Sequence, residues 1–199
     1  RGIGYYEQYR ADESLNSYGL PDYINGPDTI TSTNLVRQLW LDNYFYGTIF
    51  SFYYEKAKTN LIFGGGLNQY DGKHYGKIVS ADVQVAVPVN YRWYDLDAVK
   101  KDFSLYGKWT QKIHQCWQTF IDLQARLVDY RLNGFRNNPA IRIKTDYLFF
   151  NPKAGITYTA GKNQIYFSYA MANTEPNRDD FETGLSQVPK PEQLHDFEA

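Results

Sequence analysis

Apolar and polar residues alternate at every second position over long stretches of this chain. In residues 117–131, one side carries Trp117, Thr119, Ile121, Leu123, Ala125 and Leu127, and the other carries Gln118, Asp122, Gln124 and Arg126, interrupted by Phe120 and Val128. A period of two is that of a β-strand, whereas the apolar side of a core helix repeats at i, i+3 and i+4. The same alternation recurs in 59–68, 101–111, 146–159 and 164–173, and less cleanly in 36–55. The pattern therefore predicts an all-β protein.

The connections between the predicted strands are alternately short and long. The short ones lie around Lys56–Ala57, around Ile113–Gln115 and at Ala160–Asn163, and the long ones span about 1–34, 69–100, 132–145 and 174–190. Loops longer than about 12–15 residues are uncommon in compact domains. Outer-membrane barrels, however, combine short periplasmic turns with long extracellular loops, and their strands need about 10 residues to cross the bilayer. The pattern favours an antiparallel up-and-down meander of about seven or eight strands in an outer-membrane barrel, and an eight-strand closed barrel is conceivable on strand count alone.

Composition narrows the function classes. The 199 residues carry a net charge of -1, which gives no electrostatic basis for nucleic-acid binding. Aromatic residues reach 18%, yet mean hydropathy is -0.58 and there is no apolar run of the roughly 18 residues that a transmembrane helix needs. This mixture fits either a soluble all-β domain or a barrel whose alternation lowers its mean hydropathy. Four aromatic residues near short turns fit an interfacial belt: Tyr54, Trp109, Trp117 and Tyr158.

Eight stretches, in order, carry a family likeness. They are GIGYYEQYR, LVRQLWLDNYFYGTIFSFYY, GGGLNQYDGKHYGK, KKDFSLYGKWTQ, FIDLQARLVDYRLNGF, FFNPKAGITY, YFSYAMANTEPNRDDF and PKPEQLHDFE. Through them the chain resembles the barrel of TonB-dependent outer-membrane receptors over nearly its whole length, most specifically from FFNPKAGITY onward. The resemblance implies that the meander is a partial segment of a large transmembrane β-barrel of about 22 strands, not a closed eight-strand barrel. It also implies a plug domain inside the barrel and energy from an inner-membrane TonB complex. The plug and the TonB box are not in this sequence, and RGIGYYEQYR lacks the apolar core of a signal peptide. Because the chain opens in Tyr-rich sequence and stops at FEA in mid-pattern, we expect it to be a piece of a longer protein.

The resemblance implies an active transport receptor, multi-pass in the cell outer membrane and in contact with its lipid. It would bind a scarce small molecule, a siderophore, haem or cobalamin-type metal chelate, and import it without covalent chemistry, so we expect no enzyme activity and no cofactor. Glycan uptake has less support. The alternative from another class is a soluble or surface-attached β-domain that binds glycans through aromatic residues. A β-rich hydrolase has the least support, because no catalytic triad or paired-carboxylate spacing is present.

Tyrosines in the first predicted long loop are the leading candidates for ligand binding. Tyr offers apolar area and a hydroxyl at low entropic cost, although packing within the loop would also explain these residues. The candidates are Tyr5, Tyr6, Tyr9, Tyr18 and Tyr23, together with His74 in the next long loop and Arg178 at the predicted mouth of the pore. The residues predicted to face the lumen are Lys108, Asp122, Gln124, Arg126 and Lys153.

Other chemistry-bearing residues are assigned no site. EPNRDDF, residues 175–181, lacks the ligand spacing of a calcium loop and is interpreted as part of a solvated extracellular loop. With a single cysteine, Cys116 and the neighbouring His114 are too few for a zinc site, and no metal site is expected. His195 is predicted to be a lumen or belt residue. The glycines at 64–66 lack the context of a phosphate loop.

Overall fold

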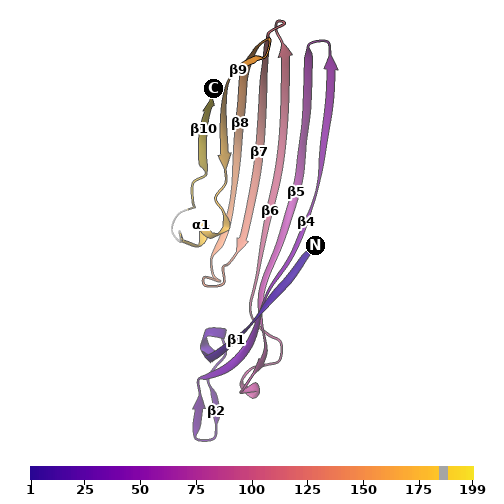
Figure 1. The fold of residues 1–199 in the computed structure, drawn as a ribbon. Coiled ribbons are helices and arrows are strands. Elements are labelled where there is room, and N and C mark those ends of the chain that lie inside the picture. Colours follow the sequence, from indigo (N-terminus) through magenta and orange to yellow (C-terminus); the bar gives the residue numbers. More distant parts are fainter. Residues whose placement is uncertain (184–187) are drawn as a thin grey trace. The chain divides into compact units, whose positions relative to one another are not determined.

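The computed structural model describes residues 1–183 and 188–199 and is nearly all β (Figure 1). Within these residues, eight antiparallel strands form one sheet in the order β1-β4-β5-β6-β7-β8-β9-β10, which is not closed into a barrel. The strands are β1 (Gly2–Ser14), β4 (Ser32–Lys56), β5 (Thr59–Ala81), β6 (Tyr91–Lys112), β7 (Trp117–Asn133), β8 (Arg142–Ala160), β9 (Asn163–Thr174) and β10 (Glu192–Glu198). The predicted all-β meander is confirmed.

The three short connections are also confirmed, and each joins two strands that are neighbours in the sheet. In the two-residue turns of β4–β5 and β8–β9, the first residue has a positive φ: 51° at Ala57 and 63° at Gly161. Glycine adopts this conformation without steric cost, and a positive φ is typical of tight hairpin turns.

The predicted long loops are wrong in extent. The first, 1–34, contains most of β1, the one-turn helix η1 (Leu15–Tyr18) and a hairpin of β2 (Tyr23–Asn25) and β3 (Asp28–Ile30). The second, 69–100, is mostly strand, and the remaining connection carries η2 (Gln84–Ala86). The alternation is hidden here because apolar residues point to both faces: Tyr75 and Ile78 have opposite parity on β5 and are 6% and 1% exposed.

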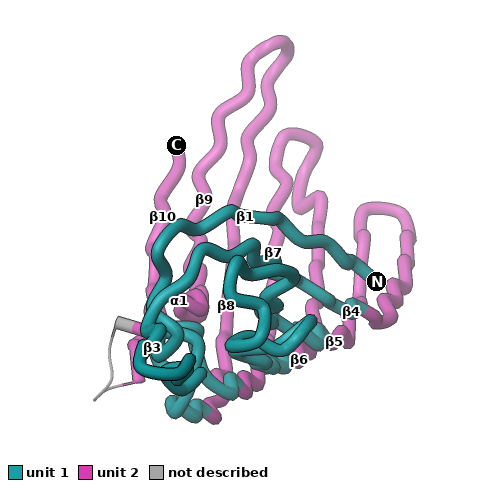
Figure 2. The backbone as a smooth tube through the Cα atoms, turned by 90° about the horizontal axis from the view of Figure 1, so that it is seen from below, with its two compact units in different colours: residues 1–45, 70–99, 132–143 teal, residues 46–69, 100–131, 144–199 magenta. Residues whose placement is uncertain are grey.

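The chain divides into two compact units (Figure 2). Unit 1 comprises residues 1–45, 70–99 and 132–143, and unit 2 comprises 46–69, 100–131 and 144–199. Unit 1 has a buried core formed by η1, by β4 and β5, and by the connections that follow η1 and η2: Leu15, Tyr18, Leu20, Leu35, Ile78 and Val87. The chain leaves η1 through Gly19, whose φ of 70° is in the left-handed region that favours glycine.

Unit 2 presents an apolar strand face that is largely exposed. Directly paired residues of β8 and β9 such as Ile156 and Phe167 share this face, and Phe50 of β4 contacts the ring of Phe63 on β5 at 6.1 Å. We call it the apolar face; its exposed large side chains include Phe50, Phe52, Leu61, Phe63, Leu67, Phe103, Ile121, Leu123, Leu127, Leu148, Phe150, Ile156, Ile165 and Phe167.

Candidate functional site

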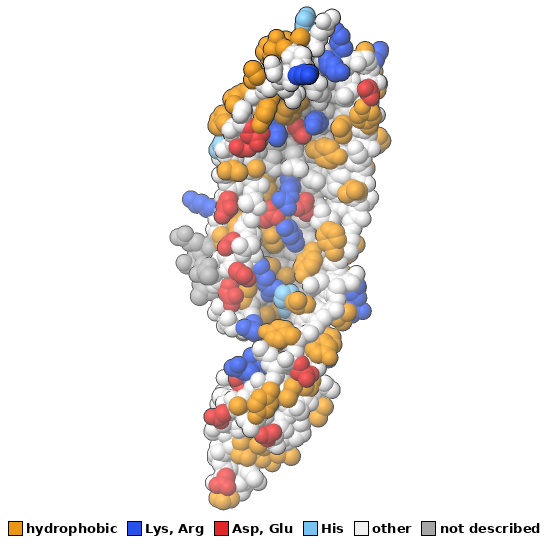
Figure 3. Space-filling view, viewed as in Figure 1, with side chains coloured by type: hydrophobic (Ala, Val, Ile, Leu, Met, Phe, Trp, Pro, Cys, Tyr) orange, Lys and Arg blue, Asp and Glu red, His pale blue; other side chains and the backbone are white. Residues whose placement is uncertain are grey.

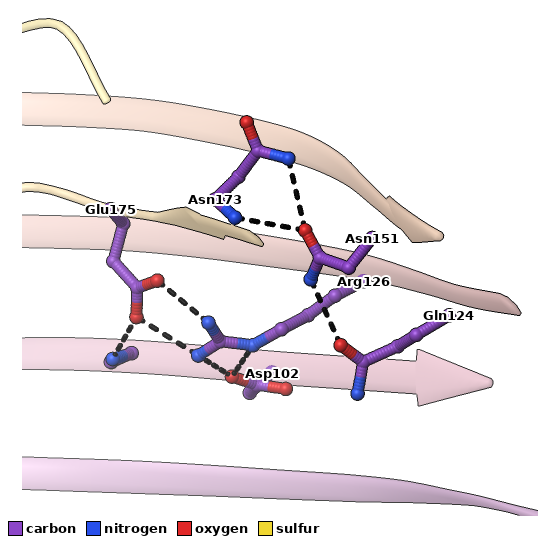
Figure 4. Close-up of polar contacts among 7 residues, drawn as sticks. Asp102, Gln124, Arg126, Asn151, Asn173 and Glu175 are labelled. Carbon is purple, nitrogen blue, oxygen red and sulfur yellow. Dashed lines mark hydrogen bonds and ion pairs between the residues drawn. The ribbon is translucent and has the colours of Figure 1, made fainter. Parts of the chain in front are cut away.

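The opposite face of β7 and β8 in unit 2 carries a chain of amide side chains (Figure 4). Asn151 Nδ2 donates a hydrogen bond to Gln124 Oε1 at 2.9 Å. Asn151 Oδ1 in turn accepts from both the side-chain and the backbone nitrogen of Asn173, each at 2.9 Å. These hydrogen bonds link amide groups of the neighbouring strands β7, β8 and β9. We call the strand face that carries them the polar face.

Two basic and two acidic side chains form an ion cluster next to these amides. Arg126 donates through Nε to Asp102 Oδ2 at 2.7 Å, and through Nη1 and Nη2 to the two carboxylate oxygens of Glu175 at 2.7 and 2.9 Å. Lys100 Nζ donates to Glu175 Oε1 at 2.6 Å. The side chains of the cluster are only 7–31% exposed. Their two positive and two negative formal charges cancel, so no net charge is buried. Figure 3 shows acidic and basic side chains lying close together along the strand face that it presents.

Glu175 lies beyond the end of β9, and its ionisation follows from these contacts. Burial alone would raise the pKa of its carboxyl group. The hydrogen bonds from Lys100 and Arg126 outweigh burial and lower the pKa from 4.5 to about 2. Glu175 is therefore a fixed anion that joins the segment after β9 to β6 and β7.

The last four residues of EPNRDDF begin an anchored helical turn, α1 (Arg178–Thr183), and Asn177 directly precedes it. Asn177 Oδ1 accepts from the backbone nitrogens of Asp179 and Asp180, and Asp180 Oδ2 accepts from the nitrogen of Asn177. These reciprocal bonds have the form of a capping box. Phe181 is 2% exposed, and its ring lies 5.8 Å from that of Tyr130. The prediction of a solvated loop is wrong for Glu175 and Phe181, because a short polar segment gives no sequence signal for a distant ion cluster or aromatic partner.

The structure brings two of the five residues predicted to face the lumen into these networks, Gln124 and Arg126. Lys108 lies with its Nζ 5.7 Å from the ring centre of Phe120. Asp122 is half-buried and Lys153 is exposed. Asp102 and Lys100 were not identified from the sequence. Asp102 precedes the exposed Phe103 on β6, so the alternation of side chains already placed it on the polar face.

In unit 1, three predicted ligand residues line one pocket. Tyr5, Tyr6 and His74 surround a cavity of about 430 Å³. The other lining residues were not predicted: Gly4, Leu39, Trp40, Leu41, Tyr94 and Arg136. Tyr5 and Trp40 stack with ring centres 4.4 Å apart. Trp40 could have been noticed in the sequence, but neither Tyr94 nor Arg136 stands in a pattern that indicates a pocket.

The remaining predicted ligand residues lie elsewhere. Tyr18 is 3% exposed in the unit 1 core, where its hydroxyl donates to Glu13 Oε2 at 2.7 Å and accepts from Arg37 Nη1 at 3.0 Å. Its ring therefore has a structural role, and burial, together with the hydrogen bond to Glu13, raises the pKa of the phenol. Tyr23 packs against the same core. Tyr9 is 65% exposed, and Arg178 is the first residue of α1 in unit 2.

The remaining histidine and cysteine candidates make local contacts only. His195 on β10 shares a hydrogen bond with the hydroxyl of Tyr169, at 2.9 Å from Nδ1. Cys116 is a half-buried free thiol. In the described part of the chain, His, Cys, Asp and Glu side chains form no group of three able to hold a metal ion. The helices described there are also too short and too polar to span a membrane.

Comparisons of the chain with protein-family models, with curated proteins and with solved structures found no match.

Proposed function

We propose that this chain is part of the barrel of an outer-membrane active transport receptor, which binds a scarce metal chelate and imports it with energy supplied through TonB. The observation that carries the proposal is the contrast between the two strand faces of unit 2. One face exposes apolar side chains, including Leu148 at 71% and Ile165 at 70%. The other carries amides and a neutral ion cluster.

The apolar face has the chemistry and height of a lipid contact. Burying one Leu, Ile or Phe side chain is worth about 1.5–3 kcal/mol, so leaving many such side chains in water has a high free energy. Along β7, the apolar residues run from Trp117 to Leu127. At about 3.3 Å per residue and a tilt of about 40°, this run spans about 25 Å, the height of the apolar band of outer-membrane barrels.

The polar face has the chemistry of a lumen wall. Its amide chain is hydrogen-bonded internally and its ion cluster pairs two cations with two anions, so these half-buried polar groups are satisfied while the face lines a water-filled passage. In this proposal, β1 and β10 pair with further strands of the receptor, because open sheet edges otherwise invite association with other chains.

One observation favours the alternative of a soluble or surface-attached glycan-binding domain. Tyr5, Trp40 and Tyr75 stack in series in unit 1, with ring centres 4.4 and 5.7 Å apart. Aromatic faces of this kind offer a large apolar surface to a ligand. The alternative does not explain the apolar face of unit 2, and we therefore place it second.

The membrane assignment is tested by a pair of neighbouring substitutions on β7. Leu123→Arg places a charge on the apolar face, and Gln124→Arg places the same charge on the polar face. In lipid vesicles we expect Leu123→Arg to cost about 2–4 kcal/mol of folding stability, and Gln124→Arg much less. Equal costs would exclude lipid contact at the apolar face. Transport is tested separately, by energy-dependent uptake of radiolabelled siderophore, haem or cobalamin into cells that produce the whole receptor.

A further inference from the structure

The unit 1 pocket has room for a small molecule. Its volume of about 430 Å³ lies within the usual range of ligand sites. Gly4 contributes to this space, because a Cβ at this position would meet no atom within 4 Å. The pairing of Gly4 with Leu41 places any side chain at position 4 on the Leu41 face of the strands.

The floor of the pocket is apolar and firmly held. Leu39 is 6% exposed and Leu41 is 48% exposed. The neighbouring pair Tyr5 and Trp40 also belongs to the lining, but its position between the pairs Gly4–Leu41 and Tyr6–Leu39 gives its side chains the opposite parity, and Trp40 stacks there on Tyr75. Cross-strand aromatic pairs stabilise a sheet locally, so this stack braces β1 against β4 directly behind the floor.

The polar groups around the floor are donors and cations. Tyr6, Tyr94, His74 and Arg136 contribute phenols, an imidazole and a guanidinium, and no carboxylate is among the lining residues. No ion pair joins Arg136 to a carboxylate in the described part of the chain. A guanidinium binds carboxylate and phosphate oxygens through two parallel hydrogen bonds.

We propose that the unit 1 pocket binds an anionic small molecule with a flat apolar body. The anionic group lies at Arg136 and His74, and the apolar body covers Leu39 and Leu41 between the rings of Tyr6 and Tyr94. The role of the pocket as a docking site for the transported solute rests on the proposed function. It adds to that function a negative charge on the solute. The binding chemistry itself depends only on unit 1.

Two probes of equal shape isolate the charge. The probe 2-naphthoate carries a carboxylate on a flat apolar body, and 2-naphthamide replaces the carboxylate with a neutral amide. Titration calorimetry on the full chain should give a dissociation constant at least about tenfold lower for naphthoate, which corresponds to about 1.4 kcal/mol. Equal affinity for the two probes would overturn the proposal.

Three variants locate the binding. Arg136→Gln should remove the preference for naphthoate and leave naphthamide binding unchanged. Gly4→Leu fills the pocket and should reduce binding of both probes more than tenfold. Arg92→Gln is the matched control, since Arg92 lies over the ring of Tyr75 at 4.1 Å and does not line the pocket. Circular dichroism verifies that each variant is folded, and undiminished naphthoate binding by a folded Gly4→Leu variant would show that the probe binds elsewhere.

The two proposals fail separately. If the chain folds into lipid but naphthoate does not bind, the anionic site is wrong and the membrane assignment stands. If naphthoate binds as expected but the Leu123→Arg and Gln124→Arg variants are equally stable in lipid, the site stands and the membrane assignment is wrong. Binding of neutral oligosaccharides in preference to both probes would overturn the anionic site and favour the glycan-binding alternative.

Discussion

Unit 1 buries a cluster of apolar side chains beneath η1, with Leu15 and Val87 at 0% exposure. Unit 2 instead exposes the large apolar residues of one face and gathers its charges on the other. Antiparallel strands are thus stabilised by an internal core in one unit, whereas the other unit needs apolar surroundings for its exposed face. In the proposed receptor, this difference corresponds to water around unit 1 and lipid at the apolar face of unit 2.

The largest expected effect comes from opening the core of unit 1. Leu35 is 2% exposed, so Leu35→Ala should lower the free energy of unfolding by about 3 kcal/mol, because the lost burial leaves a cavity. Leu123→Ala on the apolar face of unit 2 should cost under about 1 kcal/mol in detergent, where no such cavity forms. Urea unfolding of both variants in the same detergent makes the measurement. Equal losses would contradict the contrast between the units.

The ion cluster should give the next largest effect. Glu175→Gln removes the shared carboxylate of Lys100 and Arg126 and leaves two partly buried cations with one anion. We expect a loss of about 2 kcal/mol in the same assay, since unpaired buried charges are costly. Glu192 on β10 is exposed, and Glu192→Gln serves as a control with an expected change of under about 0.5 kcal/mol. Matching losses in the two variants would show that the cluster contributes nothing specific.

The same carboxylate predicts a dependence on pH. The pKa of Glu175 is lowered from 4.5 to about 2 in the folded chain, so ionised Glu175 stabilises the fold fully above pH 4.5. This contribution should decrease as pH falls from 4.5 toward 2. The stability difference between the wild type and Glu175→Gln should therefore shrink over this interval. A difference that stays constant down to pH 2 would contradict the pairing.

The smallest effect is expected at the start of α1. Asn177→Ala removes the side chain that accepts hydrogen bonds from Asp179 and Asp180, and loss of an N-cap typically costs about 1 kcal/mol. Asn177→Asp, which keeps an acceptor oxygen, is the matched control and should cost less. Local hydrogen exchange of residues 178–181 should rise in the alanine variant alone.

The alternation of side chains predicted most of unit 2, because most strands there have one apolar and one polar face. The end of β4 is an exception, since Ile49 lies opposite in parity to Phe50 and is 88% exposed. The alternation also predicted the three short turns and placed Gln124 and Arg126 on the face that carries the networks. The extent of β1 and the course of β5 beyond residue 68 could not be predicted, since buried residues such as Tyr75 and Ile78 point to both faces in unit 1.

Contacts between residues distant in the sequence were also beyond prediction. Arg126 and Glu175 are 49 positions apart, and only the antiparallel order of the strands brings them together. The unit 1 pocket likewise joins Gly4, Leu41 and Arg136 from three separate stretches. Sequence reasoning found the tyrosines and His74 by residue type, but it could not distinguish the pocket residue Tyr6 from the core residue Tyr18.

In the proposed receptor, the apolar face of unit 2 contacts lipid and the polar face contacts water. Nitroxide labels at positions 121, 122, 123 and 124 of β7, in the full chain reconstituted in lipid with Cys116→Ser, distinguish the two surroundings residue by residue. We expect oxygen, which dissolves in lipid, to relax the labels at Ile121 and Leu123, and a water-soluble nickel complex to relax those at Asp122 and Gln124. Access of the nickel complex to all four positions, or an absence of alternation, would contradict the claim.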